Sequence, residues 1–185
     1  MEHVILFAGP MGAGKSTAIA TLSEIPVVTT EAANTERDVV DKATTTVALD
    51  YGEITTGEDE KVRLYGVPGQ KRFDFMWAIL KDRARGLVML VNNDDPDPVA
   101  AMLERLEPFD ELVRRRAVVI GVTRTDVGVG TTTIADYAAG IRDAYPGLVL
   151  PILTVDARDS FRMRTLLLSL VAILEAAAQV EEVQA

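Results

Sequence analysis

The sequence predicts an α/β protein built on a doubly wound, mostly parallel β-sheet. Short hydrophobic runs alternate along the chain with segments long enough for helices, which is the pattern of such folds. Two of these runs, Leu87–Val91 and Ala117–Thr123, are almost continuously apolar, as expected of central strands covered on both faces. The length of 185 residues is close to the roughly 150 residues typical of one domain.

Six strands are expected. Thr46–Ile54 and Lys61–Val67 are joined by the turn-like Gly57–Asp59 and predict a hairpin, which gives the sheet one antiparallel edge strand. The other expected strands are Val4–Ala8, Leu87–Val91, Ala117–Thr123 and Leu148–Leu153. The expected helices are Lys15–Glu24, Arg72–Arg83, Pro98–Leu106, Thr133–Tyr145 and Ser160–Ala178. We therefore expect a single domain over residues 1–178 and a frayed acidic tail over 179–185.

Composition excludes several kinds of chemistry. The chain has no cysteine, which removes disulfides, thiolate zinc sites, cysteine nucleophiles and cysteine-linked lipids. It has one histidine, His3, so histidine-based catalysis and multi-histidine metal sites are nearly excluded as well. A formal charge of −9 makes the chain a poor candidate for binding nucleic acid or an anionic membrane surface.

The sequence carries no recognisable targeting signal. Met1–Phe7 lacks a basic leader followed by a long apolar core. The longest apolar stretches, Leu166–Leu168 and Leu170–Leu174, are shorter than the roughly 18–20 residues that span a bilayer. We therefore expect a cytoplasmic protein with no direct membrane anchor.

The segment Gly9–Ser16 matches the pattern G-x-x-x-x-G-K-[ST], after an apolar strand and before a helix. Glycines let the backbone approach a chain of phosphates closely, and the start of the next helix adds a positive end. Lys15 supplies a point charge to the outer phosphates, and Ser16 a hydroxyl for Mg²⁺. The sequence thus predicts a mononucleotide site whose loop residues are Met11, Gly12, Ala13, Gly14, Lys15, Ser16 and Thr17.

Four further motifs follow the phosphate loop along the chain. Thr44–Thr46 precedes one strand, and Gly66–Gln70 ends the next. Thr123–Asp126 and Asp156–Arg158 follow the last two strands. This order and spacing resembles the Ras-like small GTPases, which carry a switch threonine, D-x-x-G-Q, N-K-x-D and S-A-K at these positions. The resemblance implies a P-loop NTPase fold of the small G-domain type that binds GTP and GDP.

Longer segments resemble one group of bacterial Ras-like GTPases. The matching segments are Thr45–Gly52, Tyr65–Trp77, Val122–Asp126 and Asp156–Arg158. This closer resemblance implies a GTP-dependent molecular switch. Proteins of this group are often encoded beside roadblock/LC7-type regulators, so we expect a regulatory partner of that type and no nucleic acid.

The resemblance also implies roles around the phosphates. Lys15 and backbone amides would stabilise charge there, Gly69 would donate its amide to the terminal phosphate, and Gln70 would orient the attacking water. The predicted Mg²⁺ ligands are Ser16 and Thr46, with Thr45 as the second choice.

The last two motifs are expected to bind the base. Asp126 would accept both N1–H and N2–H₂ of guanine, which adenine does not offer, and Arg124 would stack its guanidinium over the ring. Thr123 stands in place of an asparagine and lacks its amide. The second motif contributes Asp156, Ala157 and Arg158, with the amide of Ala157 donating to guanine O6.

Two positions depart from the Ras-like pattern. Gly66 stands where those proteins hold Mg²⁺ through an aspartate, so we expect weaker Mg²⁺ retention and faster nucleotide release. Asp50 and Asp94 are both candidates to replace that carboxylate. Met11 replaces a glycine that leaves room for Gln70 and an arginine finger, so slow intrinsic hydrolysis is expected.

No arginine supplied within the chain stands out as catalytic. Arg37 and Arg72 lie in the expected switches, where a surface ion pair is the simpler role for each. A partner that completes the site agrees with this. Phe73, Phe75, Met76 and Trp77 have the spacing of a helix face packed in the core, and in the alternative interpretation Trp77 with Tyr51 offers such a partner an aromatic anchor.

Two other functions stay open. Gly66 and Met11 permit a nucleotide-loaded binding module that does not hydrolyse. An ATP-dependent small-molecule kinase would need an arginine-rich lid, and Arg114–Arg116 is a poor one because it lies directly before a central strand.

Overall fold

The structure is a computed structural model that describes residues 2–32, 47–56, 61–67, 83–126 and 132–184. Its strands are β1 (Glu2–Ala8), β2 (Val28–Ala32), β3 (Val47–Thr55), β4 (Lys61–Gly66), β5 (Ala84–Asn92), β6 (Val118–Thr123) and β7 (Ile152–Thr154). Its helices are α1 (Lys15–Leu22), α3 (Pro98–Leu106), α4 (Asp110–Arg114), α5 (Ile134–Ala144) and α6 (Ser160–Gln184), with a 3₁₀ turn over Glu107–Phe109.

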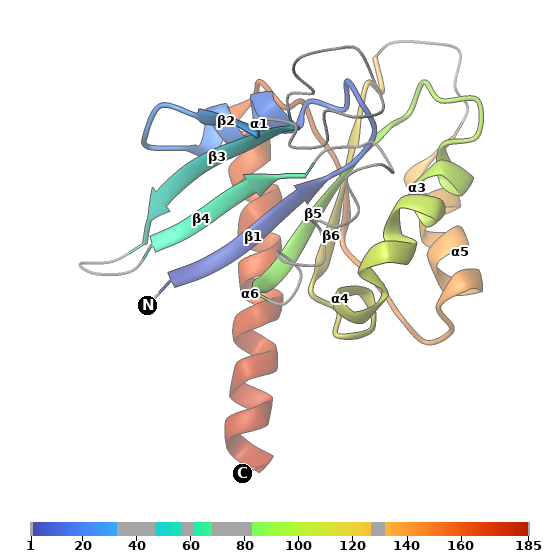
Figure 1. The fold of residues 1–185 in the computed structure, drawn as a ribbon. Coiled ribbons are helices and arrows are strands. Elements are labelled where there is room, and N and C mark those ends of the chain that lie inside the picture. The colour runs from blue at the N-terminus through green and yellow to red at the C-terminus, as the bar shows by residue number, and fades with distance from the viewer. Residues whose placement is uncertain (1, 33–46, 57–60, 68–82, 127–131, 185) are drawn as a thin grey trace, which may run out of the picture.

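The strands form one seven-stranded sheet in the order β2-β3-β4-β1-β5-β6-β7 (Figure 1). Every pair from β4 to β7 is parallel, and β3 runs antiparallel to both of its neighbours. The predicted α/β fold with a mostly parallel sheet and one antiparallel strand is therefore confirmed.

Strand β2 was not predicted from the sequence, and it adds a seventh strand to the sheet beyond β3. As a result β3 is second from the edge, where the sequence predicted the edge strand itself. The segment Val-Thr-Thr-Glu-Ala is short and has no clear apolar alternation, so it carries little strand signal by itself. Its backbone pairing with β3 supplies the structure.

The helices follow the predictions closely, with differences at their ends. Helix α3 has the predicted bounds, because the Asp97 carboxylate accepts the amide of Ala100 at 3.1 Å and caps the first turn. Helix α1 ends at Leu22 and not at Glu24, because Ser23 is extended and its hydroxyl accepts the amides of Ile25 and Glu53. Helix α4 was not predicted, and the expected helix Arg72–Arg83 lies almost entirely outside the described residues.

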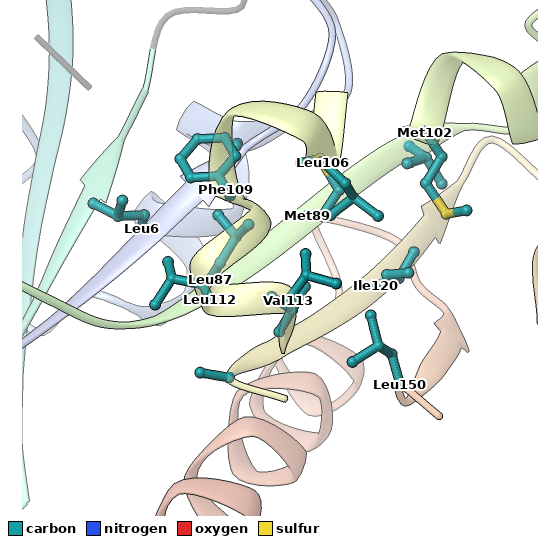
Figure 2. Packing of buried hydrophobic residues seen from close by; sticks show 14 of the residues in the cluster. Leu6, Leu87, Met89, Met102, Leu106, Phe109, Leu112, Val113, Ile120 and Leu150 are labelled. Carbon is teal, nitrogen blue, oxygen red and sulfur yellow. The ribbon is translucent and has the colours of Figure 1, made fainter. Parts of the chain in front are cut away.

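Helices cover both faces of the sheet, and each face has its own hydrophobic core. Leu106, Phe109 and Val113 pack with Leu6 and Met89 on the face covered by α3, α4 and α5 (Figure 2). The other core is formed against α1 and α6 by Ile5, Phe7, Ile19, Val88, Met163, Leu166 and Leu170. Alternate residues of β1 and β5 enter opposite cores, which explains why the segments Val4–Ala8 and Leu87–Val91 are apolar on both faces.

Helix α6 is longer than predicted and extends well beyond the sheet (Figure 1). Residues 179–184, expected as a frayed tail, continue the helix to Gln184. By length and composition the segment Ser160–Val180 is apolar enough to cross a membrane, a property that a count of uninterrupted apolar residues did not reveal. The core helices of globular proteins can be equally long and apolar. In α6, the side chains of Met163, Leu166 and Leu170 are fully buried against the sheet.

Leu166→Ala is expected to lower the free energy of unfolding by about 2–5 kcal/mol, because the side chain is 0% exposed and its loss leaves a cavity. Leu168→Ala is the matched control on the same helix, since that side chain is 65% exposed and its loss should cost no more than about 0.5 kcal/mol. Urea unfolding followed by circular dichroism measures both. Equal effects would show that α6 does not pack on the sheet as described.

Candidate functional site

The predicted phosphate loop connects the end of β1 to the start of α1, at the carboxyl edge of the sheet. Gly12 and Gly14 have φ angles of 76° and 90°, in the left-handed region that favours glycine. A Cβ atom on Gly14 would lie 2.7 Å from the Cβ of Ala157, so the loop is also packed against the segment after β7. The glycines of the motif are therefore required by both backbone shape and space.

Lys15 folds back over this loop. Its ammonium donates to the carbonyl oxygens of Gly9 at 2.9 Å and Pro10 at 2.8 Å. Burial and, after it, the positive charge of Arg105 together lower the pKa of Lys15 to about 8, while Asp50 opposes the shift. An anion in the loop would favour the protonated form, because it would offset both the burial and the repulsion.

A pocket of about 560 Å³ opens beside the loop. Its walls come from three segments that are far apart in the sequence: the loop itself, the end of β6 and the turn after β7. Predicted site residues that line it are Gly12, Ala13, Gly14, Thr17, Thr123, Arg124, Asp126, Asp156, Ala157 and Arg158. The structure thus brings together most of the predicted nucleotide-binding residues, while their individual roles stay predictions.

Arg124 joins two of these walls. Its backbone has φ 57°, and its guanidinium donates to the carbonyl oxygen of Gly12 at 3.0 Å and to the Asp94 carboxylate at 2.9 Å. The side chain is therefore fixed in the wall of the pocket by a charge-assisted pair and a backbone contact. Asp94, one of two candidates for replacing the carboxylate missing at Gly66, is instead engaged with Arg124.

Thr123 is 5% exposed, and its hydroxyl donates to the carbonyl oxygen of Val91 at 3.0 Å. It therefore ties β6 to β5 and does not reproduce the amide that the Ras-like pattern has there. The neighbouring Asn93 is buried and accepts a hydrogen bond from the Tyr137 hydroxyl at 2.8 Å, which anchors the segment that carries Asp94. Sequence reasoning missed Asn93 and Tyr137, because neither belongs to a motif.

The turn after β7 is held by two local interactions. The Arg158 guanidinium donates to both oxygens of the Asp156 carboxylate, and these bonds hold the pKa of Asp156 at about 2. The carbonyl oxygen of Ala157 accepts the hydroxyl of Thr21 at 2.8 Å, which fixes this turn to α1. The Asp156 carboxylate is thus ionised at neutral pH and engaged by Arg158.

A carboxylate from β3 lies beside Ser16. Asp50 is paired with Gly66 in the antiparallel register of β3 and β4, and its carboxylate accepts the Ser16 hydroxyl. A Cβ atom on Gly66 would lie 3.1 Å from the Cβ of Asp50 and 3.3 Å from one of its carboxylate oxygens. Asp50 therefore occupies the space that a side chain at position 66 would enter.

The comparisons with known proteins agree with this geometry. A family described as "Conserved hypothetical ATP binding protein" matches residues 26–127, which is more than half of the chain. The chain belongs to this ATP-binding family. Nucleotide binding by a P-loop domain is therefore supported both by the family and by the loop seen in the structure.

The chain also resembles two individual proteins. It is 35% identical over 96 residues to "Uncharacterized protein MJ1339" of Methanocaldococcus jannaschii, a match that covers 50% of this chain and 58% of the relative. The chain thus spans less than two thirds of that relative's length. The G domain of the Thermotoga maritima (T. maritima) FeoB iron transporter superimposes with a TM-score of 0.61 at 14% identity, covering 94% of this chain and 99% of that domain, and it shows the fold alone.

Several predicted residues of this family member lie outside the described residues. They are Thr45, Thr46, Gly69, Gln70, Arg37, Arg72 and Trp77. Met11 is described and is 73% exposed, so its side chain is not packed in the core. The roles of these residues stay predictions.

Gly12→Ala is expected to weaken nucleotide binding roughly tenfold to a hundredfold, because its Cβ would lie 2.9 Å from the Arg124 guanidinium and displace a charged hydrogen bond. Gly147→Ala is the control, because Gly147 has a similar φ of 81° but nothing within 4 Å of the added atom. Fluorescence titration with labelled GDP and ADP measures both variants. Equal affinities in the two variants would contradict a role for the Arg124–Gly12 contact.

Proposed function

We propose that the protein is a GTP-binding molecular switch that hydrolyses GTP slowly. The observation that carries the proposal is the pocket beside the phosphate loop, because Arg124 and the exposed Asp126 both line it and would contact a base bound there. A carboxylate at that position accepts two hydrogen bonds from the N1–H and N2–H₂ groups of guanine, whereas adenine has no matching pair of donors. The description of the family as ATP-binding makes ATP the competing ligand.

The phosphates of the nucleotide lie along the loop in this proposal. Lys15 and the amides of the loop stabilise their negative charge, and the start of α1 contributes its positive end. Gln70, predicted from its motif, orients the water that attacks the terminal phosphate. Two arginines at the pocket, Arg124 and Arg158, are paired with Asp94 and Asp156, which supports a slow intrinsic rate.

The residues present fit a magnesium ion. The Ser16 hydroxyl and the Asp50 carboxylate lie in contact and are the hard oxygen donors that Mg²⁺ prefers, with nucleotide phosphates and water completing its shell. Thr46 is the further predicted ligand. When bound, the ion neutralises charge on the phosphates.

The switch would act through a partner. We propose a roadblock/LC7-type regulatory protein as this partner, on the basis of the sequence resemblance, and a cytoplasmic location. Trp77 and Tyr51 are the aromatic side chains that the sequence offers to it.

Phosphate release from Mg·GTP by the purified protein tests the proposed function, with Gln70→Leu as the inactive control. We expect slow release that Gln70→Leu abolishes while nucleotide affinity is kept. Competition of labelled GTP by unlabelled ATP tests the base, and we expect GTP to compete far better. Release of phosphate from ATP in preference to GTP would contradict the proposed preference for guanine. Absence of release from GTP even in the presence of a partner protein would contradict the proposed GTPase activity.

Asp50→Asn is expected to make nucleotide release insensitive to removal of Mg²⁺ by a chelator, because the variant lacks the carboxylate charge beside Ser16. In the wild type and in Asp94→Asn, chelation should accelerate release of labelled GDP several-fold. Stopped-flow fluorescence measures the release rate with and without chelator. If Asp94→Asn loses the Mg²⁺ dependence and Asp50→Asn keeps it, the assignment of Asp50 is wrong.

A further inference from the structure

Arg105 brings a second positive charge to the phosphate loop from a different element. It lies in the last turn of α3, and its Nε atom is buried with no hydrogen-bond partner in the described part of the chain. A buried guanidinium N–H without a partner is costly, since its hydrogen bonds to water are lost and not replaced. Such a group calls for an acceptor that arrives with a ligand.

Arg105 and the phosphate loop line the same small cavity of about 10 Å³, which shows that they lie close together. This cavity is lined by Arg105, by Pro10 of the loop, by Asn92 at the end of β5 and by Asp95 after that strand. The carbonyl oxygen of Pro10 also accepts the Lys15 ammonium at 2.8 Å. The two cationic side chains therefore approach the loop at the same residue.

This residue marks the end of the loop away from the base. The large pocket is lined by Gly12, Gly14 and Thr17, whereas Pro10 lines the small cavity. In a loop of this type the lysine reaches the outer phosphates. Arg105 thus lies on the side where the terminal phosphate of a nucleotide would be.

The electrostatics agree with this position. The guanidinium of Arg105 is close enough to the Lys15 ammonium for the two positive charges to repel each other. Two cations that repel each other in a half-buried place are both stabilised when an anion binds between them. Asp95 also lines the cavity, and its carboxylate accepts the amide of Asp97 at the start of α3.

We propose that Arg105 is a further phosphate-binding residue, whose guanidinium contacts the terminal phosphate of a bound nucleoside triphosphate and stabilises its charge during hydrolysis. This inference rests on the proposed function. It supplies an arginine from within the chain, on a helix outside every sequence motif.

The step itself balances without any additional reactant. The water oxygen bonds to the terminal phosphorus, and the bond from that phosphorus to the bridging oxygen breaks. The electron pair of the broken bond stays on the departing nucleoside diphosphate. One proton of the water stays on the attacking oxygen, and the other ends on another oxygen of the inorganic phosphate. Arg105 stays protonated throughout and acts as a hydrogen-bond donor.

Arg105→Ala and Arg105→Lys test the proposal, with Arg142→Ala as the control. Arg142 is also in the last turn of its helix, α5, but is exposed to solvent, so its removal controls for loss of a helix-end charge. For each protein, affinities for GDP and for a non-hydrolysable GTP analogue are measured by fluorescence, and single-turnover phosphate release is measured from Mg·GTP. Thermal unfolding by circular dichroism reports whether each variant folds.

We expect Arg105→Ala to bind GDP within about twofold of the wild type but to lose roughly tenfold or more in affinity for the analogue or in the release rate. Arg105→Lys should fall between, and Arg142→Ala should match the wild type. Equal loss of GDP and analogue affinity, or an analogue affinity and a release rate that both match the wild type, would overturn the proposal for Arg105 while leaving the proposed function intact. If Arg105→Ala unfolds, Arg105→Lys decides by the same comparison, and a wild type that binds neither nucleotide would overturn both.

Discussion

Pairing of β1 with parallel strands on both of its sides fixes the place of the loop that follows it. β4 and β5 hold β1 at the centre of the sheet, and its alternate side chains are buried in the two cores. The loop therefore leaves the sheet at a point where neighbouring strand ends also arrive. Parallel sheets place their ligand sites at this edge, because all the connections that follow the strands meet there.

The contacts across this edge make a site from segments that are far apart in the chain. Arg124 after β6 donates to the loop carbonyl of Gly12 and to Asp94 after β5. Ala157 after β7 packs against Gly14 and accepts the hydroxyl of Thr21. These contacts join strand ends to the loop, to the helix after it and to each other, so a change in one strand end would alter the position of the others.

Positive charge is concentrated around the phosphate loop. The chain carries a formal charge of −9, yet Lys15, Arg105 and Arg124 all lie near the loop. Ras-like proteins carry a carboxylate at the position of Gly66, and we propose that Asp50 of the neighbouring strand supplies it here. Asp50 of β3 lies opposite Gly66 of β4 in the antiparallel pair. A carboxylate from β3 therefore occupies the space that a side chain at position 66 of β4 would enter.

The sequence by itself determined the local features: the α/β fold, the phosphate loop from Gly9 to Ser16, the bounds of α3 and the motifs that line the pocket. These follow from hydrophobic period, capping residues and glycine positions, which act between residues close in the chain. Other features depend on the tertiary structure, which places Asp50 beside Ser16 and Asp94 beside Arg124, adds β2 to the sheet, and brings Arg105 close to the loop and Tyr137 to Asn93. Those outcomes depend on strand register and helix packing, which join residues distant in the sequence and leave no pattern within any one segment.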